Sequence, residues 1–106
     1  MPASVKIGSM TYRVSDSVED LNEYENKLQK SLAGASHGPS AIIVINPKHD
    51  SMYKRQTLVH EIVHQVFESV AGWSPKNEEK ICRVLEAGLL GVIRENPGLI
   101  AWLQSE

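Results

Sequence analysis

The pentapeptide HEIVH at residues 60–64 contains the side chains whose types and spacing best suit metal binding and catalysis. Histidines four positions apart on a helix project from one face, so His60 and His64 can both reach one zinc ion. Glu61 lies beside them and can take a proton from a water whose pKa the metal has lowered. The spacing therefore predicts a Zn²⁺ site with His60 and His64 as ligands and Glu61 as the general base.

The residues around this motif predict the helix that the motif needs. A long helix is expected over residues 53–71, ending at Gly72. Its apolar side chains recur at helical spacing and form one stripe, made of Val59, Ile62, Val63, Val66, Phe67 and Val70. At 100° per residue, His60 and His64 fall on one flank of this stripe and Glu61 lies a little further out. Such a flank suits metal ligands, because the core supports them while water and substrate can still reach them.

A catalytic zinc site also needs a third protein ligand and an open fourth position. The longer motif HExxHxxGxxH is excluded, because Phe67 and Val70 stand where it requires glycine and histidine. A second helix is expected over residues 77–95, and its candidate ligands are Glu78, Glu79 and Glu86. A short antiparallel connection would bring the start of this helix close to the end of the first, which favours Glu79. The register of the two helices is not readable from sequence, so all three glutamates stay open.

The periodicity of this second helix predicts which of its faces is buried. The expected buried face consists of Ile81, Leu85, Gly88, Leu89 and Val92, with Glu78 near its centre and Glu79 and Glu86 on its flank. Cys82 falls within the same apolar arc and is interpreted as a small buried hydrophobe rather than a thiolate ligand. Residues 99–103 predict a short amphipathic segment that packs back on the core, and Trp73 and Trp102 are expected to close the ends of the core.

The N-terminal half predicts a small sheet and one further helix. Residues 5–14 have the alternation of a β-hairpin around Gly8 and Ser9, and residues 17–32 have helical spacing. Residues 33–40 are expected to be a loop, and the β-branched run at 41–45 a strand. That strand either pairs with an extended peptide at a sheet edge or lies in the core, covered on both faces. The expected fold class is α+β.

Length, composition and charge narrow the possible functions. At 106 residues, the chain is expected to be one domain spanning 1–106, with the 42% hydrophobic and 23% charged residues of an ordinary globular protein. A net charge of −2 gives no reason to expect nucleic acid or an anionic membrane as partner. The single cysteine cannot form an internal disulfide, and neither a membrane span nor a signal peptide is visible, so a cytoplasmic location is expected.

Several short patterns give a more specific resemblance. Thr57, Leu58 and Val59 precede the motif; Glu79, Cys82 and Leu85 follow at three-residue steps; then come GLL at 88–90 and ENP at 95–97. Over about residues 40–104 the chain resembles small HExxH proteins encoded by phages and prophages, and it is more distantly similar to zinc peptidases of the ImmA/IrrE type.

This resemblance implies a minimal zincin-like, gluzincin-like fold that binds one Zn²⁺ through His60, His64 and Glu79, with Glu61 as the base. It further implies a peptidase acting on a peptide or protein. The main alternative is a catalytically silent zincin-like module that acts by binding a protein partner, and a third possibility is a metal-free interaction domain. Substrate and oligomeric state stay undetermined.

Overall fold

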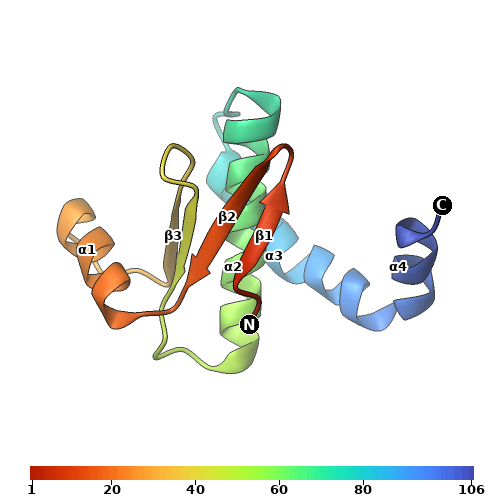
Figure 1. Cartoon of the computed structure of the whole chain (residues 1–106), viewed down its shortest axis with the longest axis horizontal. Coiled ribbons are helices and arrows are strands. Elements are labelled where there is room, and N and C mark those ends of the chain that lie inside the picture. The colour runs from red at the N-terminus through yellow and green to blue at the C-terminus, as the bar shows by residue number, and fades with distance from the viewer.

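A four-stranded mixed sheet and four α-helices build an α+β fold, seen in a computed structural model that describes residues 1–106 (Figure 1). In chain order the elements are β1 (Ser4–Ile7), β2 (Met10–Ser15), α1 (Val18–Leu28), β3 (Gly34–His37), β4 (Ile42–Ile45), α2 (Ser51–Gln65), the π-helical segment η1 (Val66–Ala71), α3 (Glu78–Glu95) and α4 (Pro97–Gln104). None of the helices combines the length and apolar character that a membrane span requires.

The strand order in the sheet is β1-β2-β4-β3. The predicted hairpin is confirmed as the antiparallel pair β1 and β2, with Gly8 at a φ of 61° in its turn. β2 and β4 are parallel, whereas β3 and β4 are antiparallel. The strand predicted at 41–45 is therefore β4, an interior strand with every residue buried, and the alternative that placed it at a sheet edge is wrong.

The prediction of a loop over residues 33–40 is also wrong, because this segment contains the edge strand β3. The sequence GASH has low β-propensity, but its antiparallel pairing with the apolar strand β4 outweighs that preference. The helix predicted at 17–32 begins as expected after the N-cap Ser17 but ends at Leu28, because Gln29 takes a left-handed conformation with φ 56°.

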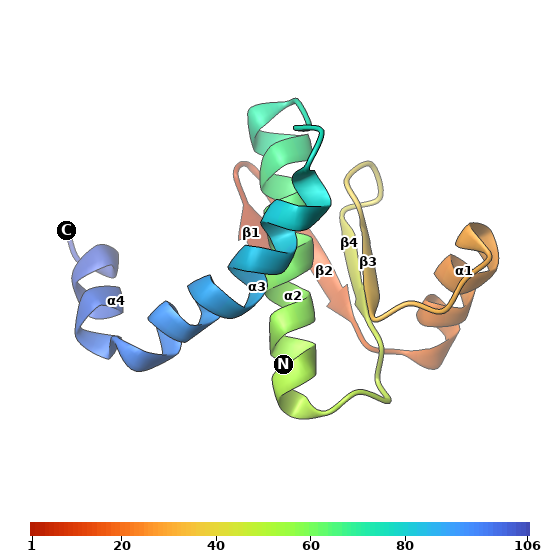
Figure 2. The same cartoon turned by 180° about the vertical axis from the view of Figure 1, so that it is seen from behind.

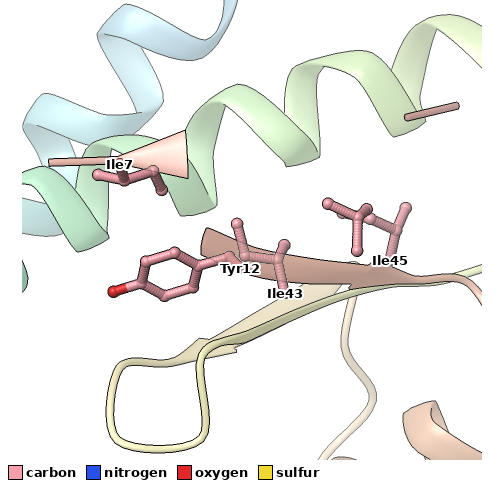
Figure 3. Close-up of a cluster of buried hydrophobic side chains, with 5 residues drawn as sticks. Ile7, Tyr12, Ile43 and Ile45 are labelled. Carbon is pink, nitrogen blue, oxygen red and sulfur yellow. The ribbon is translucent and has the colours of Figure 1, made fainter. Parts of the chain in front are cut away.

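Two clusters of apolar side chains hold the layers together. On the face of the sheet toward α2, the buried residues are Ile7, Tyr12, Val14, Ile43 and Ile45 (Figure 3). Leu58 and Ile62 of α2 pack against this cluster. On the opposite face, Leu21 of α1 packs against Ile42 and Val44 of β4. The sheet thus gives α2 a rigid support, because both faces of its central strand β4 are covered.

The helix predicted over residues 53–71 is confirmed, with Gly72 at its end in the left-handed conformation (φ 76°). Its first turn is capped by Asp50, whose carboxylate accepts the Tyr53 N–H at 2.9 Å. The final six residues, η1, take the wider π-helical register. The motif at 60–64 therefore lies within the regular part of a helix that rests on the sheet.

The helix α3 crosses α2 and then runs out from the body of the fold, with α4 at its far end (Figures 1 and 2). The buried residues of α3 are Cys82 and Leu90, whereas Gly88, Leu89 and Val92 are exposed. The predicted buried face of this helix is therefore wrong for those three residues. The physical reason is that α3 packs on α2 through its first turns and then leaves the body of the fold, which therefore does not cover these three positions (Figure 2).

The C-terminal segment is helical, but the prediction that it packs back on the core is wrong. Leu99 and Leu103 of α4 are exposed, and so are both tryptophans, with Trp73 at 60% and Trp102 at 71% relative exposure. The tryptophans do not close the core, because the core lies between α2, the sheet and α1, and α4 contacts α3 beyond it.

Candidate metal centre

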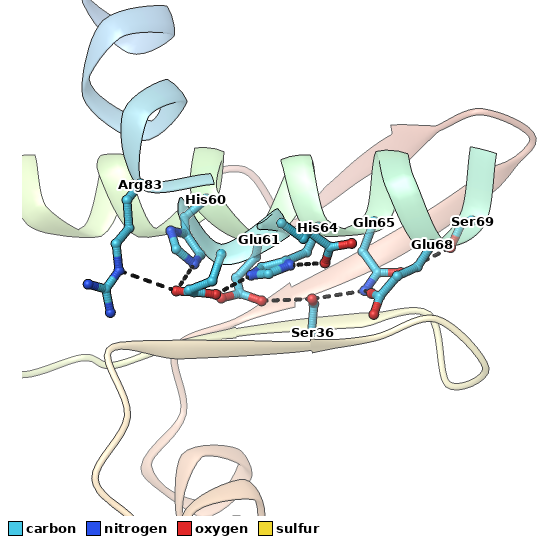
Figure 4. A network of polar contacts seen from close by, with 10 residues as sticks. Ser36, His60, Glu61, His64, Gln65, Glu68, Ser69 and Arg83 are labelled. Atoms are coloured by element: carbon cyan, nitrogen blue, oxygen red, sulfur yellow. Dashed lines mark hydrogen bonds and ion pairs between the residues drawn. The ribbon is translucent and has the colours of Figure 1, made fainter. Parts of the chain in front are cut away.

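The crossing of α2 and α3 brings the two histidines of the motif against the first turns of α3. His60 and His64 lie one turn apart, with ring centroids 4.9 Å apart, and their side chains are only 13% and 18% exposed. Both rings point into the same space between the helices (Figure 4). The arrangement matches the requirement that two imidazoles reach a single point.

The carboxylate of Glu79 bridges the two imidazole rings. Its Oε1 lies 3.0 Å from Nε2 of His60, and its Oε2 lies 2.8 Å from Nε2 of His64. Arg83, one turn further along α3, approaches the same carboxylate with its Nε 3.6 Å from Oε1. Glu79 is therefore the glutamate whose carboxylate contacts the Nε2 atoms of both histidines.

The other two glutamates left open by the sequence contact the remaining ring nitrogens. Glu78 is hydrogen-bonded through Oε2 to Nδ1 of His64, and Oε2 of Glu86 lies 3.6 Å from Nδ1 of His60. A carboxylate at Nδ1 fixes the orientation and tautomer of a metal-binding histidine, leaving Nε2 for the metal. All three candidates thus lie at the site, but in different positions.

Glu61 lies deeper than the sequence indicates. It was expected further out than the histidines, but it is the most buried of the three, at 8% relative exposure, and it faces the edge strand β3. There the Ser36 hydroxyl donates a hydrogen bond of 2.7 Å to its Oε1. The amphipathic pattern of α2 could not indicate this, because the burial of Glu61 depends on the strand β3, whose Ser36 contacts it and whose Gly34 lies against Thr57 of α2.

The protonation of these groups follows from burial and from their mutual charges. Burial raises the pKa of Glu61, although the hydrogen bond from Ser36 and the charges of His64 and His60 oppose that shift. Burial alone would lower the pKa of His64, but its contacts with Glu78, Glu61 and Glu79 raise it overall. Burial likewise favours neutral Glu79, yet the neighbouring histidines hold its pKa below the usual value.

Cys82 adds a further donor that the sequence interpretation set aside. It is fully buried, as predicted, and its sulfur lies within a group formed with His60 and His64 in which the ligand atoms are all within 4.8 Å of one another. These three side chains could hold a metal ion. Burial and the charges of Glu78 and Glu79 raise the pKa of its thiol to about 12. Glu79 and Cys82 are therefore both candidates for the third ligand, and Glu79 contacts the two Nε2 atoms directly, at 3.0 and 2.8 Å. The spacing of Cys82 from Glu79, three residues on a helix, could have indicated its position.

The donor set fits a divalent cation such as zinc. Ligands bound at 2.0–2.1 Å in a tetrahedron lie roughly 3.3 Å apart, comparable with the separations at Glu79. The site gathers four carboxylates, those of Glu61, Glu78, Glu79 and Glu86. One oxygen of Glu78, Oε1, is buried without a hydrogen-bond partner. A cation would offset this excess of negative charge.

No protein-family model, curated protein or solved structure matches this chain. The resemblance to phage zinc peptidases thus stays a prediction.

A cavity of about 820 Å³ opens over the site. It is bordered by β3, by the segment that precedes it from Leu28 onward, and by both helices of the site. A second cavity of about 420 Å³ shares Ser36 and Glu68 with the first and continues it along β3. His37 borders the second cavity and Tyr53 the first, while His49 packs against Tyr53.

Proposed function

We propose that this chain is a zinc-dependent metallopeptidase with His60, His64 and Glu79 as ligands and Glu61 as general base. The observation that carries the proposal is the Glu79 carboxylate bridging the Nε2 atoms of both histidines at 3.0 and 2.8 Å. Three protein donors leave a fourth position open, as catalytic zinc sites require. When bound there, zinc would polarise a carbonyl group and lower the pKa of water.

The position of Glu61 fits proton transfer. Its Oε1 accepts the Ser36 hydroxyl, which leaves Oε2 to take a proton from the attacking water. Because burial raises its pKa, Glu61 holds this proton more readily than an exposed carboxylate would. The same oxygen can then deliver the proton to the leaving amine of the cleaved peptide bond.

The edge strand β3 supplies a binding surface for an extended peptide. The Asn46 N–H donates to the Ala33 carbonyl at 2.8 Å, and hydrogen-bonded pairs alternate along an antiparallel ladder. The main-chain groups of Gly34 and Ser36 are thereby directed toward the open edge, which borders the large cavity. A peptide added there as a further strand would lie alongside Glu61. Pairing with a peptide, which the sequence suggested for residues 41–45, is therefore assigned to β3 in this proposal.

The decisive experiment compares the wild-type protein with Glu61→Gln, using metal analysis and cleavage of a peptide library. Both proteins are expected to bind one zinc ion per chain, and only the wild type to hydrolyse peptides, because the amide cannot accept a proton. Glu95→Gln, an exposed residue at the far end of α3, is the matched control and should keep full activity.

Hydrolysis by Glu61→Gln would contradict the assignment of the base. Stoichiometric zinc without cleavage of any peptide, together with capture of a stable protein partner, would support the binding module in place of the peptidase.

A further inference from the structure

Gln65, in the last turn of α2, is 1% exposed, and both the oxygen and the nitrogen of its amide have hydrogen-bond partners. Its Oε1 lies 2.9 Å from the Tyr12 hydroxyl and 3.0 Å from the Ser69 hydroxyl. These two hydroxyls are also 2.5 Å from each other, so one of them donates to the other and the second donates to Oε1. Its Nε2 donates to Oε2 of Glu68 at 3.0 Å and to Oγ of Ser36 at 2.9 Å (Figure 4). A buried amide is costly unless it is satisfied in this way, so an apolar side chain would be the simpler choice for packing alone.

The donor and the acceptor of each hydrogen bond between Gln65 and the proposed base can be assigned. The amide group that faces the Glu68 carboxylate is the NH₂, which donates one hydrogen to Glu68 and the other to Ser36. The Ser36 oxygen thus accepts from Gln65, and its own hydrogen is left for Oε1 of Glu61. The donors run in one sequence from Tyr12 through Gln65 and Ser36 to the carboxylate of Glu61.

The π-helical segment η1 contributes Ser69 to this series of hydrogen bonds. It begins directly after Gln65 and places the Ser69 hydroxyl against the amide oxygen, while Tyr12, at 0% exposure, anchors the chain in the sheet core. Single turns of π-helix occur often at functional sites. Elements far apart in sequence, β2, β3 and α2, are therefore joined by one series of buried and half-buried hydrogen bonds that ends on the proposed base.

We propose that Ser36 is a positioning residue, oriented by Gln65 and Tyr12, that fixes the Glu61 carboxylate with Oε2 directed to the cleft. The terminal torsion of a glutamate is broad, so a carboxylate held at neither oxygen would sample many orientations. The hydroxyl of a serine rotates as well, and the donation from Gln65 removes that freedom. The effect on turnover rests on the proposed function, whereas the hydrogen-bond chain itself can be tested without it.

The kinetic test uses Ser36→Ala, Ser36→Thr and Tyr12→Phe in the zinc-loaded protein. Ser36→Ala is expected to lower kcat by ~10–100-fold while KM and zinc content stay near wild type, because outer-shell hydrogen bonds have effects of this size. Ser36→Thr keeps the hydroxyl and should restore most of kcat, and Tyr12→Phe should cause a smaller loss. The control is Ser4→Ala, on the exposed opposite edge strand. Unchanged kcat in Ser36→Ala, or no rescue by threonine, would overturn the positioning role.

A second measurement needs no activity. Urea midpoints of the zinc-free protein are compared for Ser36→Ala, Glu61→Leu and the double variant. The midpoint loss from Ser36→Ala should be clearly smaller in the Glu61→Leu background, where the acceptor is already gone. Additive shifts would refute the coupling of these two side chains. A wild-type protein that cleaves no peptide but shows this non-additivity would instead refute the proposed peptidase and leave the hydrogen-bond chain intact.

Discussion

The close approach of β3 to α2 at Gly34 leads to a sharp stability prediction for Gly34→Ala. A Cβ at this position would lie 2.6 Å from Cγ2 of Thr57 and 2.7 Å from the carbonyl oxygen of Val44. Thr57 is 4% exposed in α2, and Val44 belongs to the central strand, so neither neighbour has room to withdraw. The strand β3 would have to move away from the helix instead.

The expected size follows from two opposing effects. Overpacking of a well-packed interior costs ~1–3 kcal/mol, and the rigid neighbours of Gly34 place this case at the upper end. Restricting the unfolded chain returns ~0.4–1 kcal/mol. The free energy of unfolding should therefore fall by about 2 kcal/mol, which at 4–8 °C per kcal/mol lowers Tm by roughly 8–16 °C.

The same substitution at Gly88 serves as the control, because an added Cβ there meets nothing within 4 Å. Gly88 lies within α3, where alanine is favoured over glycine by ~0.5–1 kcal/mol, so Gly88→Ala should raise Tm by a few degrees. Thermal unfolding followed by circular dichroism on zinc-free protein measures both variants. A Gly34→Ala protein that melts at or above the wild-type temperature would refute the close approach of β3 and α2.

Three further outcomes are expected. Glu79→Ala should weaken zinc binding strongly in competition with a chromophoric chelator, whereas a comparable loss in Cys82→Ser but not in Glu79→Ala would assign the third ligand to the thiol. Removing zinc with a chelator should lower Tm, since a ligand at 100 times its Kd stabilises the folded state by about 2.7 kcal/mol. Hydrogen bonds from Ser15 and Ser17 hold the pKa of Asp20 below its usual 3.8. Ionised Asp20 therefore stabilises the folded protein fully above that pH, and this contribution is lost as the pH falls through the lowered pKa. Asp20→Asn should therefore melt below wild type at pH 7, and the difference should shrink in acid; a gap that widens would contradict this.

The elements that the sequence predicts correctly are those defined by local rules. The β1–β2 hairpin follows from alternation around Gly8, and the long helix follows from its apolar stripe and from Gly72 at its end. The spacing of His60 and His64 is also local, since one helical turn is enough to bring their rings together. Such features depend on neighbours within a few residues, so the sequence pattern is enough to predict them.

Features that depend on residues far away in the sequence could not be predicted from it. The strand β3 has no pattern of its own and exists because it pairs with β4, so no signal within residues 33–40 could indicate it. Ser36 and its contact with Glu61 therefore could not be foreseen, and neither could the deep burial of Glu61. The choice among the glutamates of α3 depended on the crossing of two helices, which has no sequence signature.

The failure at α3 has a physical meaning of its own. Periodicity assigns Leu89 and Val92 to the interior, yet both are exposed in the structure. The side chains that α3 directs to α2 are Glu78, Cys82 and Glu86. Placing carboxylates in an interior is costly unless charges or ligands compensate, and Oε1 of Glu78 is still unpaired. Local rules tend to be broken where a site requires it. The carboxylates that α3 places against α2 therefore favour a cation between the two helices, and this observation is independent of the HExxH spacing.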